Sequence, residues 1–229
     1  MLRKVVGELR HHVPFTVFGT VLGVGLMLVV VLGNVPEHIS HWLFYSFHPL
    51  HVFFSAVATA GMYTLHGRKN LLLVLVIGYV GAIGIATLSD SLIPYAGEWL
   101  LGLHADPHGG HAHAHEGAHI GFIEMWWLVN AMAVAGVLVG YYRPRTELPH
   151  AMHVLLSMAA STFHVVMALK GQIDVVTALV MSAFLFIAVW LPCCTSDIVF
   201  PLLLTGKVDH HHGKHSRDEK DESTEGHSE

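Results

Sequence analysis

Long apolar stretches separated by short charged segments dominate this sequence. A helix needs about 20 apolar residues to cross the hydrocarbon core of a bilayer. The stretches that reach this length lie at about 14–33, 46–66, 71–95, 119–141, 150–169 and 173–204. Hydrophobic residues make up 53% of the chain and charged ones only 13%, whereas a soluble domain carries about 25% charge. The pattern predicts an all-α, polytopic membrane bundle of six transmembrane helices, with no soluble catalytic domain and hence no enzyme.

The distribution of basic residues predicts the orientation of this bundle. If both termini are cytoplasmic, all Lys and Arg residues except Lys170 fall on the cytoplasmic side, which is the bias expected of a protein in the cell (inner) membrane. The net charge of −5 comes from the acidic tail, so the lipid bilayer is an expected partner and nucleic acid is not. Segment 34–45 is predicted to be an interfacial loop or short helix. The oligomeric state stays open, with a homo-oligomer among the alternatives.

Each half of the chain carries the same polar signature. It begins with His-x-x-His, followed by hydroxyl residues one and two helical turns later, and it ends with Ser-Asp-x-x-x-Pro. The first copy consists of His48, His51, Ser55, Thr59, Ser89, Asp90 and Pro94. The second copy consists of His150, His153, Ser157, Ser161, Ser196, Asp197 and Pro201. This order predicts a duplication.

Three spans per copy would insert the two halves with opposite orientation, as in the inverted repeats of many transporters. The predicted units are a first three-helix repeat, a His-rich extracytoplasmic loop, a second three-helix repeat and a disordered, His-rich acidic cytoplasmic tail. They cover residues 1–103, 104–118, 119–206 and 207–229. Proline disrupts a helix, so we expect the third and sixth spans to break or bend near Pro94 and Pro201.

The histidines and hydroxyls of the second and fifth spans recur every three or four residues, which places each set on one helical face. Such a polar stripe must avoid lipid and is expected to face the bundle interior. Two imidazoles at i and i+3 can approach one transition-metal ion. The alternative is a hydrogen-bond network that holds the helices together.

Two aspartates lie deep within apolar sequence, where a carboxylate can bind a cation or exchange it for a proton. The predicted metal ligands are therefore His48, His51, Asp90, His150, His153 and Asp197. Predicted pathway or secondary positions are Ser55, Thr59, Ser157, Ser161, His164, His12, His119 and Glu124. The alternative for each Ser-Asp pair is a helix N-cap. Cys193 and Cys194 could ligate a soft metal, but a buried structural role is commoner for cysteine.

A helix that opens with His-x-x-His-x-x-x-Ser, followed by one that ends in Ser-Asp-x-x-x-Pro, resembles the half-repeat of the heavy-metal exporter permeases. These are duplicated membrane proteins grouped with manganese, copper/zinc and organoarsenical permeases. The resemblance rests on Ser55, Ser89, Asp90 and Pro94 and on Ser157, Ser196, Asp197 and Pro201. The chain departs from the family in having about six spans instead of around ten, and histidine where Pro-Cys or Pro-Gln-Cys is expected.

The residues and the resemblance together lead us to expect a secondary transporter, with export as its direction, for a divalent transition metal ion. Zn, Mn, Fe, Co, Ni and Cu are the candidate substrates, and protonation of His or Asp would couple their release to a proton gradient. One alternative is a membrane haem protein of electron transfer with bis-His ligation. Another is a metal sensor subunit that does not transport.

The sequence leaves open whether there is one metal site or two. Straight helices that start at residues 46 and 150 would place His48, His51, Asp90 and His119 near the outer face. They would place His150, His153, Asp197 and His12 near the inner face. A single site at the midplane requires another arrangement, and a distance from His51 to His153 beyond ~20 Å would rule it out, because the hydrocarbon core is ~30 Å thick.

Overall fold

The computed structural model describes residues 2–33, 35–67, 69–100, 121–168 and 175–205, and these residues form helices and short connections without a strand. The first half contains α1 (Leu2–Leu32), α2 (Glu37–His66), α3 (Leu71–Thr87), the π-helical turn η1 (Leu88–Leu92) and α4 (Ile93–Leu100). The second half contains α5 (Gly121–Glu124), α6 (Trp126–Tyr142), α7 (Glu147–Ala168), α8 (Val175–Cys194), the π-helical turn η2 (Thr195–Val199) and α9 (Phe200–Thr205). The predicted all-α class is therefore confirmed.

Four helical segments are both long and apolar enough to cross a membrane. They are Arg10–Val30, Leu71–Gly97, Glu147–Met167 and Ala183–Thr205. Helix α6 is apolar but has only 17 residues, and α2 is long but carries the polar stripe. Large apolar side chains stay exposed on the outer helices, such as Val29 at 67% and Leu72 at 73%. These features indicate an integral membrane protein, while the count of six spans stays a prediction.

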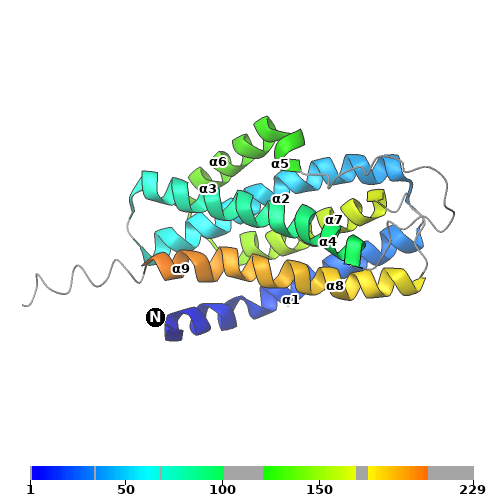
Figure 1. Cartoon of the computed structure of the whole chain (residues 1–229). Coiled ribbons are helices and arrows are strands. Elements are labelled where there is room, and N and C mark those ends of the chain that lie inside the picture. Colours follow the sequence, from blue (N-terminus) through cyan, green and yellow to red (C-terminus); the bar gives the residue numbers. More distant parts are fainter. Residues whose placement is uncertain (1, 34, 68, 101–120, 169–174, 206–229) are drawn as a thin grey trace, which may run out of the picture.

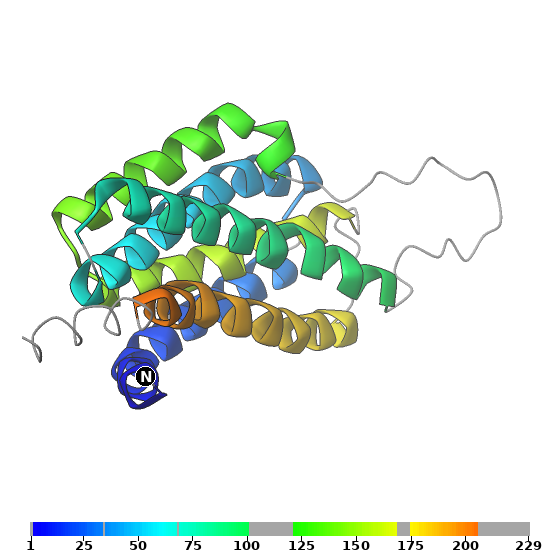
Figure 2. The same cartoon turned by 60° about the vertical axis from the view of Figure 1, so that its left-hand side comes forward.

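Helices α2 and α7 occupy the middle of the bundle. Figures 1 and 2 show α6 along one side of the bundle and α1 along the opposite side, with α2 and α7 between them. Helix α2 packs on α6 and α3, whereas α7 packs on α1 and α8, and α2 and α7 pack on each other. Along α2, ring contacts pass from Phe44–His164 to Phe47–Phe163 and then to His51–His153. The partner numbers fall as the α2 numbers rise, so the two helices are antiparallel.

Glycines allow the flanking helices to approach this central pair closely. A Cβ at Gly140 of α6 would lie 2.6 Å from the backbone oxygen of Val57 on α2. A Cβ at Gly19 of α1 would lie 2.5 Å from the backbone oxygen of Ala151 on α7. Small residues that let helix backbones touch are typical of packing between membrane helices, where apolar burial alone gives little driving force.

The predicted breaks at the two prolines do not occur. Pro94 and Pro201 are the second residues of α4 and α9, and the chain stays helical through both Ser-Asp elements. A π-helical turn precedes each proline, and it ends with a hydrogen bond from residue i to i−5, from Ile93 N–H to the Leu88 oxygen in the first copy. The wider turn accommodates the irregularity without separating the helix into two pieces.

The expectation of an interfacial loop or short helix for segment 34–45 is met only in its helicity, because residues 37–45 are helical but form the first turns of the long helix α2. Helix α2 therefore has 30 residues and begins nine residues earlier than the apolar run that starts at residue 46. This extension moves His48 and His51 from the expected end of a span to the middle of a long helix.

Candidate metal centre

The polar stripes of α2 and α7 face the interior of the bundle, which confirms their predicted placement. Every member except His66, which is half-buried, has at most 1% of its surface exposed. On α2 the buried members are His48, His51, Ser55, Thr59 and Met62; on α7 they are His150, His153, Ser157, Ser161 and His164. Because uncompensated polar groups are costly in such surroundings, their partners need to be identified one by one.

The first copy of the signature forms a cluster around the Asp90 carboxylate. His48 Nδ1 lies 2.9 Å and His51 Nδ1 2.5 Å from Asp90 Oδ2. The other oxygen, Oδ1, accepts hydrogen bonds from Ser157 Oγ at 2.8 Å and from Ser89 Oγ at 3.0 Å. The π-helical turn η1 carries Asp90 with 0% exposure, so the carboxylate binds two imidazoles from its own half and one hydroxyl from the other half.

The second copy repeats this arrangement around Asp197. His150 Nδ1 lies 3.0 Å from Asp197 Oδ2, and His153 Nδ1 contacts the same oxygen. Ser55 and Thr59, both on α2 of the first half, donate to Oδ1 at 3.3 Å and 3.2 Å. Each buried aspartate is thus held by the imidazoles of its own half and by hydroxyls of the other half.

The two clusters meet at the centre of the bundle. The ring centroids of His51 and His153 are 4.4 Å apart, with 30° between the ring planes. This distance is far below the ~20 Å that would exclude a single site in a hydrocarbon core of ~30 Å. The geometry therefore favours one central site over two sites at opposite faces.

The hydrogen bonds to the aspartates fix which ring nitrogen is available to a ligand. An imidazole whose Nδ1–H donates to a carboxylate keeps an unprotonated Nε2 when it is neutral, and this pairing is usual behind metal-binding histidines. Nε2 of His48, His51 and His153 has no hydrogen-bond partner among the described residues, although all three atoms are buried. Each of these three atoms can offer a lone pair to a ligand when its ring is neutral.

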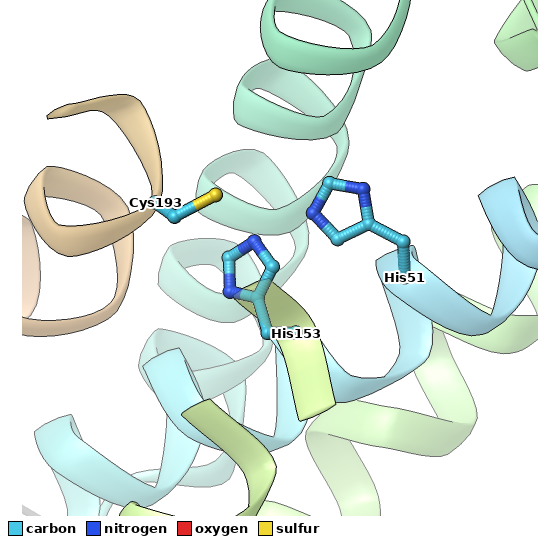
Figure 3. A group of neighbouring side chains, drawn as sticks. All are labelled: His51, His153 and Cys193. Atoms are coloured by element: carbon cyan, nitrogen blue, oxygen red, sulfur yellow. The ribbon is translucent and has the colours of Figure 1, made fainter. Parts of the chain in front are cut away.

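In this geometry the aspartates position the imidazoles. Direct ligation by Asp90 or Asp197, as predicted from the sequence, would require the ion to replace the Nδ1 hydrogen bonds. Among the described residues, side chains that could hold a metal ion form three groups with ligand atoms within 4.8 Å of one another. The groups are His48, His51 and Asp90; His150, His153 and Asp197; and His51, His153 and Cys193. The third group, drawn in Figure 3, joins the two halves.

The predicted position His12, together with Thr16 and Glu8, which were not predicted, extends the second cluster toward one end of the bundle. His12 is buried, and its ring contacts that of His150 at 5.5 Å between centroids. Thr16 Oγ1 lies 3.0 Å from His150 Nε2. Half-buried Glu8 lies beyond them, with its carboxylate 3.8 Å from His12 and 3.2 Å from His66. These side chains, which carry nitrogen or oxygen atoms able to bind a metal ion, extend from the site to the end of the bundle that carries Glu8.

The remaining predicted positions lie outside the centre. Ser161 donates to the backbone oxygen of Ser89, next to Asp90, at 3.0 Å. His164 is buried against Phe44. Glu124 is exposed and accepts a hydrogen bond from Tyr45. His119, the His-rich loop and the His-rich tail lie outside the described residues.

Cys193 lies outside the site predicted from the sequence, because a buried structural role is commoner for cysteine. The structure places its side chain beside His51 and His153, with 0% exposure. Cys193 precedes Asp197 by four residues, so the two side chains lie on one helical face. This spacing could have indicated that Cys193 lies beside the site.

A comparison of the chain with protein-family models, with curated proteins and with solved structures finds no match.

Proposed function

We propose that this protein is a secondary transporter that moves a divalent transition metal ion across the cell membrane, with export as its direction. The observation that carries the proposal is the His51–His153 pair: two fully buried imidazoles, one from each half, with adjacent rings and unpartnered Nε2 atoms. Neutral imidazole nitrogen suits Zn, Cu, Fe and Ni. A site between the two halves at the centre of a membrane bundle matches the usual plan of secondary transporters.

The crosswise contacts support an inverted repeat as the architecture behind this function. Helix α1 packs on α7 and α6 packs on α2, so the first helix of each half contacts the second helix of the other. The two central helices are antiparallel, as halves of three spans with opposite orientation require. Six spans with both termini in the cytoplasm would complete this arrangement.

Charge balance supports coupling to protons. Asp90 and Asp197 are buried with 0% and 1% exposure, and two carboxylates in an apolar interior need two positive charges nearby. Two protons on the surrounding imidazoles meet this requirement, and so does one divalent ion. Exchange of one ion for two protons would therefore keep the interior neutral in both states.

The alternative of a haem protein is less compatible with the geometry of the central pair. In bis-His ligation the macrocycle lies between the two imidazoles, whereas the rings of His51 and His153 are adjacent, at 4.4 Å between centroids. A non-transporting metal sensor would use the same residues and differs only in the absence of flux.

The test is metal uptake into proteoliposomes that contain the purified full chain and a fluorescent zinc indicator, with a proton gradient imposed. We expect flux from the wild type and its loss in His51→Ala and His153→Ala. His38→Ala is the matched control, because His38 is an exposed histidine of the same helix, and it should retain flux. Zinc binding without flux would leave only the sensor, and a Soret absorbance band in the purified protein would favour haem. Expression in a metal-sensitive strain tests direction, since an exporter raises tolerance.

A further inference from the structure

Cys193 lies at the junction of the two halves, beside the central imidazole pair. Its Sγ and one ring nitrogen each of His51 and His153 lie within 4.8 Å of one another. Figure 3 shows the thiol of Cys193 pointing toward the two rings, and the three side chains come from α8, α2 and α7. All three residues have 0% of their surface exposed.

We propose that Cys193 is the third ligand of the central ion, which makes the substrate a metal that accepts sulfur, with zinc the best fit. The inference rests on the proposed function and specifies its substrate class. Two independent observations support it: the buried thiol, and the unpartnered Nε2 atoms of His51 and His153 beside it.

The size of the group fits a tetrahedral ion. Zinc binds nitrogen at about 2.0–2.1 Å and sulfur at about 2.3 Å, so its ligand atoms are separated by about 3.3–3.6 Å. The three side chains must therefore close in by at most about 1.5 Å from separations of at most 4.8 Å. Three protein ligands leave the fourth position open, and this suits an ion that must enter and leave.

The chemistry of the donors sets the selectivity. Thiolate and imidazole together favour zinc, and thiolate also favours Cu(I), whereas Mn and Mg prefer carboxylate and carbonyl oxygen. On binding, the thiol proton is released and the sulfur lone pair forms the new bond to the metal. The proton leaves the protein together with one imidazole proton, so the exchange of two protons for one divalent ion is unchanged.

The two halves differ at this position, so only one such ligand exists. Cys193 stands three residues before Ser196, and the residue three before Ser89 is Ala86, which is also fully buried. A methyl group in one half and a thiol in the other give one nitrogen–nitrogen–sulfur site at the centre. The alternative role for Cys193 is apolar packing, since it also belongs to a buried cluster with Val154, Met158 and Val189.

The test is cobalt titration of the purified full chain in detergent, followed by absorption spectroscopy. We expect the d–d bands of bound Co(II) together with a near-ultraviolet thiolate-to-cobalt charge-transfer band. Cys193→Ser should lose the charge-transfer band, and its zinc affinity should fall by at least tenfold, the lower bound for loss of a supporting residue. Its Mn affinity should change little. Cys194→Ser is the matched control: this neighbouring free thiol contacts His150 Nε2 at 3.9 Å and is not part of the group with His51 and His153, so the variant should keep both the band and the affinity.

The possible outcomes distinguish ligation by Cys193 from the proposed transport function on which it rests. Bound cobalt without a charge-transfer band, or a band lost only in Cys194→Ser, overturns the role of Cys193 and leaves the imidazole site intact. Absence of any cobalt or zinc binding to the wild type overturns both proposals. If Cys193→Ser does not fold, Cys193→Ala reproduces the residue found in the first half. X-ray absorption of zinc-loaded Cys194→Ser needs no change at Cys193, and a missing sulfur shell at about 2.3 Å would refute the inference.

Discussion

Asp90→Asn isolates the charge of a buried carboxylate from its hydrogen bonds. Asp90 Oδ2 faces two imidazole Nδ1 atoms, and Oδ1 accepts from the hydroxyls of Ser157 and Ser89. A serine hydroxyl can act as acceptor as well as donor. The asparagine can therefore keep its oxygen on the imidazoles and turn its NH₂ group toward the serines. All positions remain hydrogen-bonded, and the negative charge is lost.

The expected effect on metal binding follows from this loss of charge. Removal of a carboxylate behind metal-binding histidines lowers affinity about 10–100-fold, which corresponds to about 1.4–2.7 kcal/mol. Only Asp197 then remains as a buried carboxylate beside the imidazoles, so the bound ion is less completely neutralised. Isothermal titration calorimetry of the folded variant measures the affinity.

Ser91→Ala is the matched control for this experiment. Ser91 lies in the same π-helical turn, is fully buried, and its Oγ has no hydrogen-bond partner among the described residues. Its removal should change zinc affinity by less than about twofold, because nothing that contacts the site is altered. Wild-type zinc affinity in a folded Asp90→Asn would refute the role of Asp90 in balancing the charge of the ion.

Three further predictions test the packing, the boundary of the site and its competition with protons. Gly140→Ala should destabilise the bundle by about 1–3 kcal/mol, because its Cβ would lie 2.6 Å from the Val57 backbone oxygen; Gly84→Ala, where a Cβ meets nothing within 4 Å, should leave the thermal midpoint unchanged. Glu124→Gln should leave zinc affinity within about twofold of the wild-type value, since Glu124 is exposed and hydrogen-bonded to Tyr45. A tenfold loss of affinity would show that Glu124 belongs to the site. Protons compete with the metal for the imidazole nitrogens, so zinc affinity should fall as the pH falls, with a slope near 2 on a logarithmic scale if two protons are displaced, and a flat profile between pH 5 and 7 would exclude proton exchange.

The burial of the polar stripes could be predicted because it depends only on local periodicity. A spacing of three and four residues places the side chains on one face of any helix, and an apolar environment forces that face inward. The pairing of stripes with hydroxyls of the opposite half could not be predicted, because Ser157 and Asp90 are separated by 67 residues and meet only through tertiary packing.

The axial position of the site was harder to predict for a physical reason. The first nine residues of α2 mix Glu, His, Ser and Trp with apolar residues, so they carry no continuous apolar signal. The predicted span therefore started at residue 46 and placed His51 near one face. Similarly, proline predicts a disrupted helix, but nothing in Ser-Asp-x-x-x-Pro distinguishes a break from a π-helical turn that keeps the helix continuous.

The crosswise hydrogen bonds have a consequence for how such a site could open. Alternating access requires one half to move against the other, and that movement must disrupt the bonds from Ser157 to Asp90 and from Ser55 and Thr59 to Asp197. Each of these bonds ends on a carboxylate that also holds the imidazoles of the central pair. An ion at His51 and His153 draws on the negative charge of both aspartates and weakens them as acceptors for the hydroxyls. The occupancy of the metal site and the strength of the hydrogen bonds between the two halves therefore depend on the same two carboxylates.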